Sequence, residues 1–166
     1  HRDLHSFPTR RSSDLIKELE KSLRLNSTLF CAYSALGIIY MEIGNYEEAE
    51  RKFNRSLILA PLYLPAIRGS ANLYMILAKD SLSKNDYPLA KINLEKSLSY
   101  WEKIASLFPG EKVTKNLAET HYELSKLYSK LNDVEKSKFH LETAKKHGYT
   151  GDRKSTRLNS SHGKLS

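Results

Sequence analysis

Cysteine, glycine and proline are scarce in this chain of 166 residues, which has 1 cysteine, 7 glycines and 5 prolines. The single cysteine excludes an internal disulfide framework and a metal site built from several thiolates. The low glycine and proline content, with 40% hydrophobic residues, excludes a collagen-like or low-complexity chain. No apolar run reaches the roughly 20 residues that a membrane-spanning helix needs, because Gly37, Tyr40 and Glu42 interrupt the most apolar stretch, residues 35–43. The composition therefore predicts one soluble globular domain without a membrane span.

The sequence patterns of common active sites are absent as well. No glycine-rich loop precedes a Lys-Ser or Lys-Thr pair, which excludes a phosphate-binding loop of that type. Cys31 has no histidine at helical contact spacing, so we predict an inert, partly buried thiol. His140 and His147 lie about 10 Å apart along a helix, which is too far for one metal ion, and His121 is expected to pack. We therefore predict no catalytic residues, no metal site and no cofactor.

The charge of the chain is concentrated at its ends. The formal net charge is +8, from 27 Lys and Arg against 19 Asp and Glu. Residues 1–15, HRDLHSFPTRRSSDL, resemble a translated sequencing adapter throughout, and residues 152–166 begin with DRKSTRLNSSH, which resembles the partner adapter. Between these two predicted non-native tails, residues 16–151 carry 20 basic and 16 acidic residues, a net charge of +4. A surplus this small does not predict a nucleic-acid partner.

Helical hairpins repeat through residues 16–151. Apolar residues recur at helical spacing, and short polar turns separate the helices. The clearest copy, residues 28–61, has an aromatic residue, a Leu-Gly pair and a tyrosine on its first helix, then Gly-x-Tyr-x-x-Ala, a phenylalanine and a closing proline: Tyr33, Leu36, Gly37, Tyr40, Gly44, Tyr46, Ala49, Phe53 and Pro61. This spacing resembles the tetratricopeptide repeat, except that Ser56 stands where the family usually has alanine.

Further copies lie on both sides of this one. A half-repeat at residues 16–27 precedes it by one period of about 34 residues, and a long repeat at 64–110 and a last repeat at 113–149 follow it. The positions where helices approach closely are all small: Gly37, Ala71 and Ser125 on first helices, and Ala49, Ala90 and Ser137 on second helices. Two insertions of seven residues predict that both helices of the long repeat, residues 65–84 and 87–107, gain about two turns. The resemblance implies an all-α, right-handed superhelical stack of about three and a half antiparallel hairpins.

The resemblance also implies a function, namely a non-catalytic scaffold that holds a protein or peptide in a concave groove lined by first helices. The candidate groove residues are those on first helices that do not face the paired helix: Ser34, Ile38, Met41, Arg68, Asn72, Met75, Tyr122 and Lys126. One hypothesis is that Arg68, Lys115 and Lys126 favour acidic segments. Arg68 and Asn72 match part of the clamp by which chaperone-binding members hold a terminal carboxylate. However, Glu119 and Glu123 stand where that clamp has Lys and Asn, so we do not predict a complete clamp.

Two alternatives to this scaffold hypothesis stay open. An unpaired second helix opens the array and no capping helix follows His147, so we expect sequence to be missing at both ends. In the first alternative, the repeats are an accessory segment of a larger enzyme or sensor. In the second, the uncapped ends associate with a second copy of the chain.

Overall fold

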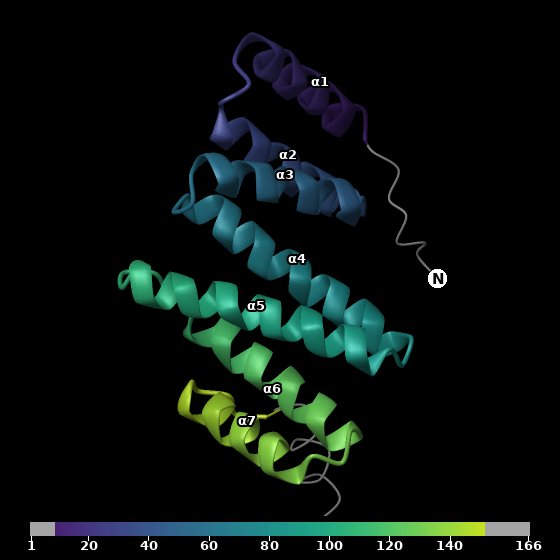
Figure 1. The fold of residues 1–166 in the computed structure, drawn as a ribbon, viewed down its shortest axis with the longest axis vertical. Helices are drawn as coiled ribbons and strands as arrows, with labels where there is room; N and C mark the ends of the chain where they lie inside the picture. Colours follow the sequence, from purple (N-terminus) through teal and green to yellow (C-terminus); the bar gives the residue numbers. More distant parts are fainter. Residues whose placement is uncertain (1–8, 152–166) are drawn as a thin grey trace, which may run out of the picture. The chain divides into compact units, whose positions relative to one another are not determined.

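The computed structural model describes residues 9–151, which contain seven α-helices and no strand (Figure 1). Two compact units divide the chain: unit 1 ends at Lys112, and unit 2 begins at Val113. The helices of unit 1 are α1 (Arg10–Leu25), α2 (Phe30–Glu42), α3 (Tyr46–Leu59), α4 (Leu64–Ser83) and α5 (Tyr87–Leu107). Those of unit 2 are α6 (Thr114–Lys130) and α7 (Val134–Lys146). The predicted all-α class is confirmed.

Unit 1 is a stack in which each helix packs on the next one along the chain, from α1 to α5. The helices α2 and α3 form one antiparallel hairpin, α4 and α5 form the next, and α1 contacts α2. In the first hairpin the helices have 13 and 14 residues, whereas in the second they have 20 and 21. Each helix of the long hairpin is therefore seven residues longer, as the paired insertions predict.

The predicted tails fall largely outside the described residues. Nothing is described for residues 1–8 or 152–166, so the adapter resemblance of those segments stays a prediction. Helix α1 begins at Arg10, and its N-cap Thr9 accepts a hydrogen bond from the backbone N–H of Ser12 at 3.2 Å. The helix thus starts six residues before Ile16, where the half-repeat was expected to begin.

A repeated turn joins the two helices of every hairpin. The residue before each second helix is an Asn or Asp whose side chain accepts the backbone N–H three residues later, at 3.1–3.3 Å: Asn45, Asp86 and Asp133. This N-cap bond satisfies one of the amides that a helix start leaves without an intrahelical partner. The residue before each cap has positive φ, 81° at Gly44 and 58° at both Asn85 and Asn132, which glycine and asparagine tolerate best. The turns therefore follow from local sequence.

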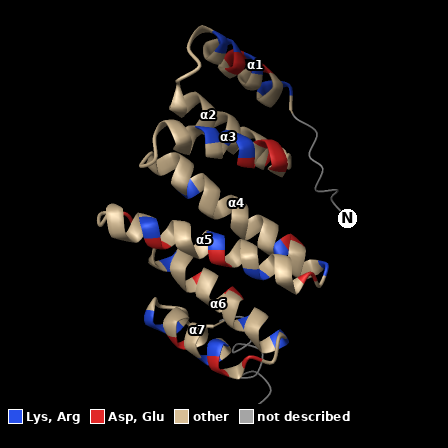
Figure 2. Ribbon diagram, in the orientation of Figure 1, with Lys and Arg blue, Asp and Glu red and all other residues tan. Residues whose placement is uncertain are grey.

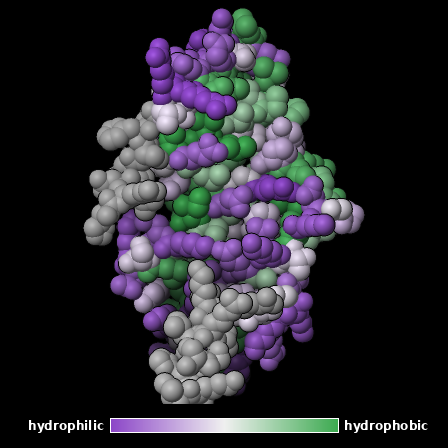
Figure 3. All heavy atoms as spheres, turned by 180° about the vertical axis from the view of Figure 1, so that it is seen from behind, coloured by the Kyte–Doolittle hydropathy of each residue, from purple (hydrophilic) through white to green (hydrophobic). Residues whose placement is uncertain are grey.

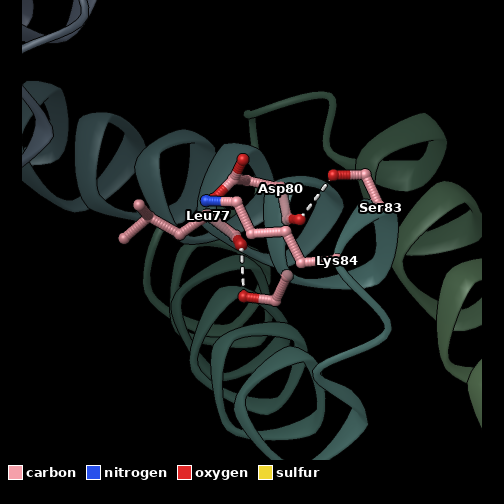
Figure 4. Close-up of polar contacts among 5 residues, drawn as sticks. Leu77, Asp80, Ser83 and Lys84 are labelled. Carbon is pink, nitrogen blue, oxygen red and sulfur yellow. Dashed lines mark hydrogen bonds and ion pairs between the residues drawn. The ribbon is translucent and has the colours of Figure 1, made fainter.

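Side chains close the last turn of the long helix α4 (Figure 4). The Ser83 hydroxyl donates to the Asp80 carbonyl at 2.7 Å, and the Ser81 hydroxyl donates to the Leu77 carbonyl at 2.8 Å. The Lys84 Nζ lies 2.6 Å from Asp80 Oδ2. The Asp80 carbonyl also accepts the backbone N–H of Lys84 at 3.2 Å, so these side-chain bonds add to the backbone bonds of the last turns of α4.

Hydrogen bonds from serine hydroxyls show which residues of the paired helices lie opposite each other. Ser56 on α3 donates to the Phe30 carbonyl, and Ser97 on α5 donates to the Ala71 carbonyl, both at 2.8 Å. Ser56 and Ser97 are equivalent in the repeat, as are Gly37 and Ala71, so the long hairpin aligns its helices seven residues further along. Ala71 therefore faces Ser97, although repeat spacing alone had grouped Ala71 with Ala90.

Unit 2 is the α6/α7 hairpin. Its α6 buries apolar side chains such as Leu124 and Leu127, whereas Ala144 is the only buried residue of α7. The Ser137 hydroxyl donates to the Ser125 carbonyl at 3.0 Å, which brings the two helices close at the position where small residues were predicted. The buried side chains of unit 2 thus lie mainly on α6.

Charged residues of both signs are intermixed on most of the described helices, whereas α2 and α4 have few (Figure 2), and hydrophobic side chains reach the surface between hydrophilic ones (Figure 3). Such mixing is typical of a solvated helical surface. Within residues 9–151 no helix is both long and apolar enough to cross a bilayer. Cys31 is exposed, so the prediction that its thiol is partly buried was wrong. It occupies the first turn of α2, next to the buried Ala32.

Candidate ligand-binding groove

A phenylalanine ring packed against two glycines sets the distance between α2 and α4, the first helices of the two hairpins in unit 1. The ring of Phe53 on α3 is 1% exposed and lies against Gly37 on α2 and Gly69 on α4. A Cβ added to Gly37 would lie 2.7 Å from the ring, and one added to Gly69 would lie 2.4 Å from it. Because only glycine leaves room for the ring, α2 and α4 approach each other over Phe53.

An open pocket of about 330 Å³ lies between α2 and α4. We call it the α2–α4 pocket, and its lining residues are Ile38, Met41, Leu64, Pro65, Arg68, Gly69, Asn72 and Glu111. Four of these, Ile38, Met41, Arg68 and Asn72, are candidates from the sequence, and the structure brings them together. Their common side is mostly apolar, with polar groups confined to Arg68, Asn72 and Glu111.

The pocket residues that sequence reasoning missed have different origins. Leu64 and Pro65 start α4, and neither is among the groove positions that the sequence predicts on this helix. Gly69 carries a detectable signal, since a glycine inside a helix usually marks a close approach. Glu111 lies in the connection between α5 and α6, 43 residues from the Arg68 that it contacts, and no local pattern identifies it.

Two other candidates of unit 1 lie outside the pocket. Ser34 is 1% exposed, and its hydroxyl has no hydrogen-bond partner within the described part of the chain. It is therefore interior and not part of an open groove. Met75 is half-buried one turn beyond Asn72 on α4 and does not line the pocket.

The candidates of unit 2 contact one another and the segment after α7. The rings of Tyr122 and Tyr149 stack with centroids 4.1 Å apart. Lys126 Nζ lies 4.9 Å from the Tyr122 ring centroid and 2.8 Å from Glu123 Oε1. A pocket of about 320 Å³ lies beside this stack, lined by Lys115, Ala118, Glu119, Gly148, Tyr149, Thr150 and Gly151. The outward face of α6 is thus partly covered by the chain itself.

Three histidines gather between α6 and α7, which spacing along α7 did not predict. His121 is 6% exposed, and its Nδ1 lies 2.9 Å from His140 Nδ1. Its ring centroid is 5.2 Å from that of His140 and 5.9 Å from that of His147. Burial, then the nearby His140 and His147, lower the pKa of His121 to about 4. The packing role expected for His121 agrees with its burial, and His140 and His147 lie on either side of it.

The geometry offers no assembled metal centre in residues 9–151, where no three His, Cys, Asp or Glu side chains are arranged to hold an ion. The hydrogen bond between His121 and His140 requires a proton on one of the two Nδ1 atoms and none on the other. One Nδ1 must donate and the other must accept, so at least one of the two rings is neutral when the bond is made.

Comparisons with known proteins agree with this architecture. Residues 30–63 and residues 118–146 each match the tetratricopeptide repeat family. No curated protein matches the chain in sequence. These two matches support a tetratricopeptide-repeat protein, and the matched repeats coincide with the α2/α3 and α6/α7 hairpins.

A solved structure shows the same fold at low identity. The crystal structure of BtubC (BKLC) from P. vanneervenii has a TM-score of 0.52 and 18% identity, covering 86% of this chain and 60% of that one. The chain therefore spans about 60% of the length of that protein. The crystal structure of MamA has a TM-score of 0.37 and 16% identity, covering 90% of this chain and 94% of that one. The repeats suggest a scaffold for protein–protein interactions, and repeats of this family are typically non-catalytic.

Proposed function

We propose that this chain binds a peptide or partner segment along its first helices, with the α2–α4 pocket as the principal contact. The observation that carries the proposal is the pocket itself, whose volume of about 330 Å³ lies at the small end of the range for ligand sites. It accepts a few side chains of an extended segment rather than a whole domain.

The lining of the pocket favours a peptide that has both apolar and acidic side chains. Ile38, Met41, Leu64 and Pro65 offer apolar surface that a ligand side chain can cover, and the gain is about 25 cal/mol for each Å² removed from water. Arg68 supplies the one positive charge among the lining residues. Glu111 is the one acidic lining residue and pairs with Arg68, so a ligand carboxylate complements the Arg68 charge where it replaces the Glu111 carboxylate.

The test begins with peptides selected on the whole chain from a random dodecapeptide phage library and then labelled for fluorescence anisotropy. Ile38→Lys places a charge in the apolar lining and is expected to weaken binding by about tenfold or more, as loss of a central contact does. Arg68→Glu reverses the charge and is expected to weaken acidic peptides by about three- to tenfold.

Matched controls separate the pocket from the rest of the surface. Ile58→Lys and Arg51→Glu make the same changes on α3, at side chains that are 70% and 71% exposed and outside the pocket. They should leave affinity unchanged, and circular dichroism verifies that all four variants keep their helices. Equal losses in the pocket variants and the controls, or no loss in either, would rule out the α2–α4 pocket as the binding site.

A further inference from the structure

The cation of the α2–α4 pocket already has an intramolecular partner. The Arg68 guanidinium donates through Nη2 to the Glu111 carboxylate, and both residues line the pocket. Arg68 belongs to the second turn of α4, whereas Glu111 follows the end of α5. The chain therefore places its own acidic side chain where an acidic ligand would bind.

The position of Glu111 depends on a defined turn. Its backbone N–H donates to the Phe108 carbonyl at 2.9 Å, and the Phe108 N–H donates to Ile104 at 2.9 Å, which ends α5. Pro109 restricts φ at the first inner position of the turn. At the same end of α5, Lys103 Nζ donates to the Pro61 carbonyl at 3.3 Å and links α5 to the turn that precedes α4. The backbone hydrogen bonds of this turn thus hold Glu111 where its carboxylate reaches Arg68.

Among residues 9–151, no such occupant fills the apolar part of the pocket. Apolar lining from α2 and α4 surrounds an open volume of about 330 Å³, while the acidic position beside it is filled. A ligand that fills both parts needs an aliphatic side chain next to a carboxylate. Its carboxylate must replace that of Glu111, because Arg68 is the only cation among the lining residues.

We propose that Glu111 is a built-in competitor that occupies Arg68 until an aliphatic–acidic peptide segment displaces it. The inference rests on the peptide groove proposed above and adds a regulatory element to it. Because the Arg68 side chain is 44% exposed and that of Glu111 is 36% exposed, water screens the pair and it opens readily. A pair of this kind lowers the affinity of a competing carboxylate by only about two- to sixfold.

The competition also sharpens selectivity. A neutral peptide of the same shape leaves the Arg68–Glu111 pair closed and gains nothing from the guanidinium. An acidic peptide replaces one carboxylate with another and adds apolar contact. Removal of the Glu111 charge should therefore strengthen acidic peptides alone, which is an effect that a merely structural role for Glu111 does not produce.

The experiment titrates two amidated tetrapeptides, acetyl-Ala-Leu-Glu-Ala-amide and acetyl-Ala-Leu-Gln-Ala-amide, into the ¹⁵N-labelled chain. Neither peptide has a terminal carboxylate, so only the glutamate side chain differs. Affinities come from NMR shifts of the Asn72 side-chain amide and the Arg68 Nε–H. The variant is Glu111→Gln, and the control is Glu48→Gln, which breaks the 2.5 Å Arg51–Glu48 pair on α3 outside the pocket.

We expect Glu111→Gln to raise the affinity for the glutamate peptide about two- to sixfold, with no change for the glutamine peptide and none from Glu48→Gln. If the wild-type chain binds the glutamate peptide in the pocket and Glu111→Gln leaves that affinity unchanged, Glu111 is no competitor but the groove stands. The same conclusion follows if both peptides gain equally. If neither peptide shifts Asn72 or Arg68 in either protein, the groove proposal itself fails.

Discussion

The α2/α3 hairpin of unit 1 and the α6/α7 hairpin of unit 2 share one plan but have different interiors. Both begin their second helix with a capping Asn or Asp after a residue of positive φ. In the first, Phe53 fills the space above two glycines. In the second, Ser125 and Ser137 hydrogen-bond and three histidine rings meet. The repeat motif therefore specifies the backbone and the small contact positions, while the remaining side chains decide how each hairpin responds to mutation and pH.

The largest expected effect breaks the apolar interior. Phe53→Ala removes a buried ring that contacts both Gly37 and Gly69, and we expect it to lower the free energy of unfolding of unit 1 by about 3–5 kcal/mol. Leu141→Ala changes the equivalent position of unit 2, where the side chain is only half-buried, and should cost about 1–2 kcal/mol. Native-state hydrogen exchange of the α3 and α7 amides measures the two units separately. Equal losses would show that the two interiors do not differ in this way.

A pH titration tests the polar interior. The pKa of His121 is about 4 in the folded chain against about 6.5 when unfolded, so the unfolded state binds more protons between these values. Its contribution to stability is complete above pH 6.5 and is lost as the pH falls toward 4, by about 3 kcal/mol in all. Protonation of both His121 and His140 also breaks the Nδ1 bond, because two imidazolium rings only donate.

Several titratable or charged groups surround His121, so the titration needs a variant that removes His121 alone. His140 of α7 and His147, the C-cap residue of α7, lie next to it. Tyr128 of α6 stacks on His140, and Lys136 Nζ lies 5.3 Å from the Tyr128 ring centroid. His121→Ile introduces the residue that the long repeat has at the equivalent position, Ile67. As the pH falls from 6.5 to 4, the free energy of unfolding of unit 2 should decrease by about 3 kcal/mol less in this variant than in the wild type, as measured by hydrogen exchange corrected for intrinsic rates. Identical pH profiles for the two proteins would contradict the assignment to His121. Unit 1 serves as an internal reference.

The smallest expected effect concerns the contact between Gly69 and the Phe53 ring. In Gly69→Ala the new methyl group meets the Phe53 ring at 2.4 Å, and this overpacking exceeds the gain in helix propensity, for a net loss of about 1–2 kcal/mol. Gly110→Ala is the matched control, because a Cβ there has no heavy atom within 4 Å among the described residues, and the change should stay within about 0.5 kcal/mol. Denaturant unfolding followed by Trp101 fluorescence compares the two. A Gly69→Ala chain as stable as Gly110→Ala would show that Phe53 moves freely.

Much of the fold was predictable because its signals are local. The expected helix of residues 87–107 has those bounds in α5, and the expected helix 65–84 differs from α4 by one residue at each end. Caps and positive-φ residues act within three or four positions, so a single sequence contains them. The alignment of α4 with α5 was harder, since Ser97 reaches Ala71 only after two extra turns have shifted the pair.

The candidate groove was predictable only in part. Helical periodicity placed Ile38, Met41, Arg68 and Asn72 on outward faces, and these four line one pocket. Periodicity could not show that Ser34 is buried, nor that Tyr149 stacks on Tyr122. Each of these depends on which element covers a face, and neighbouring residues do not encode that.

By itself, the sequence determined the helical hairpins, their turns, their lengths and the small residues between them, because each depends on interactions within a few residues or on a repeated spacing. Only the tertiary structure decided that Glu111 reaches Arg68 over 43 residues and that His121 lies between His140 and His147. The physical reason is that such contacts arise where packed helices bring distant side chains together. Their energies depend on burial and distance, which are properties of the packed chain.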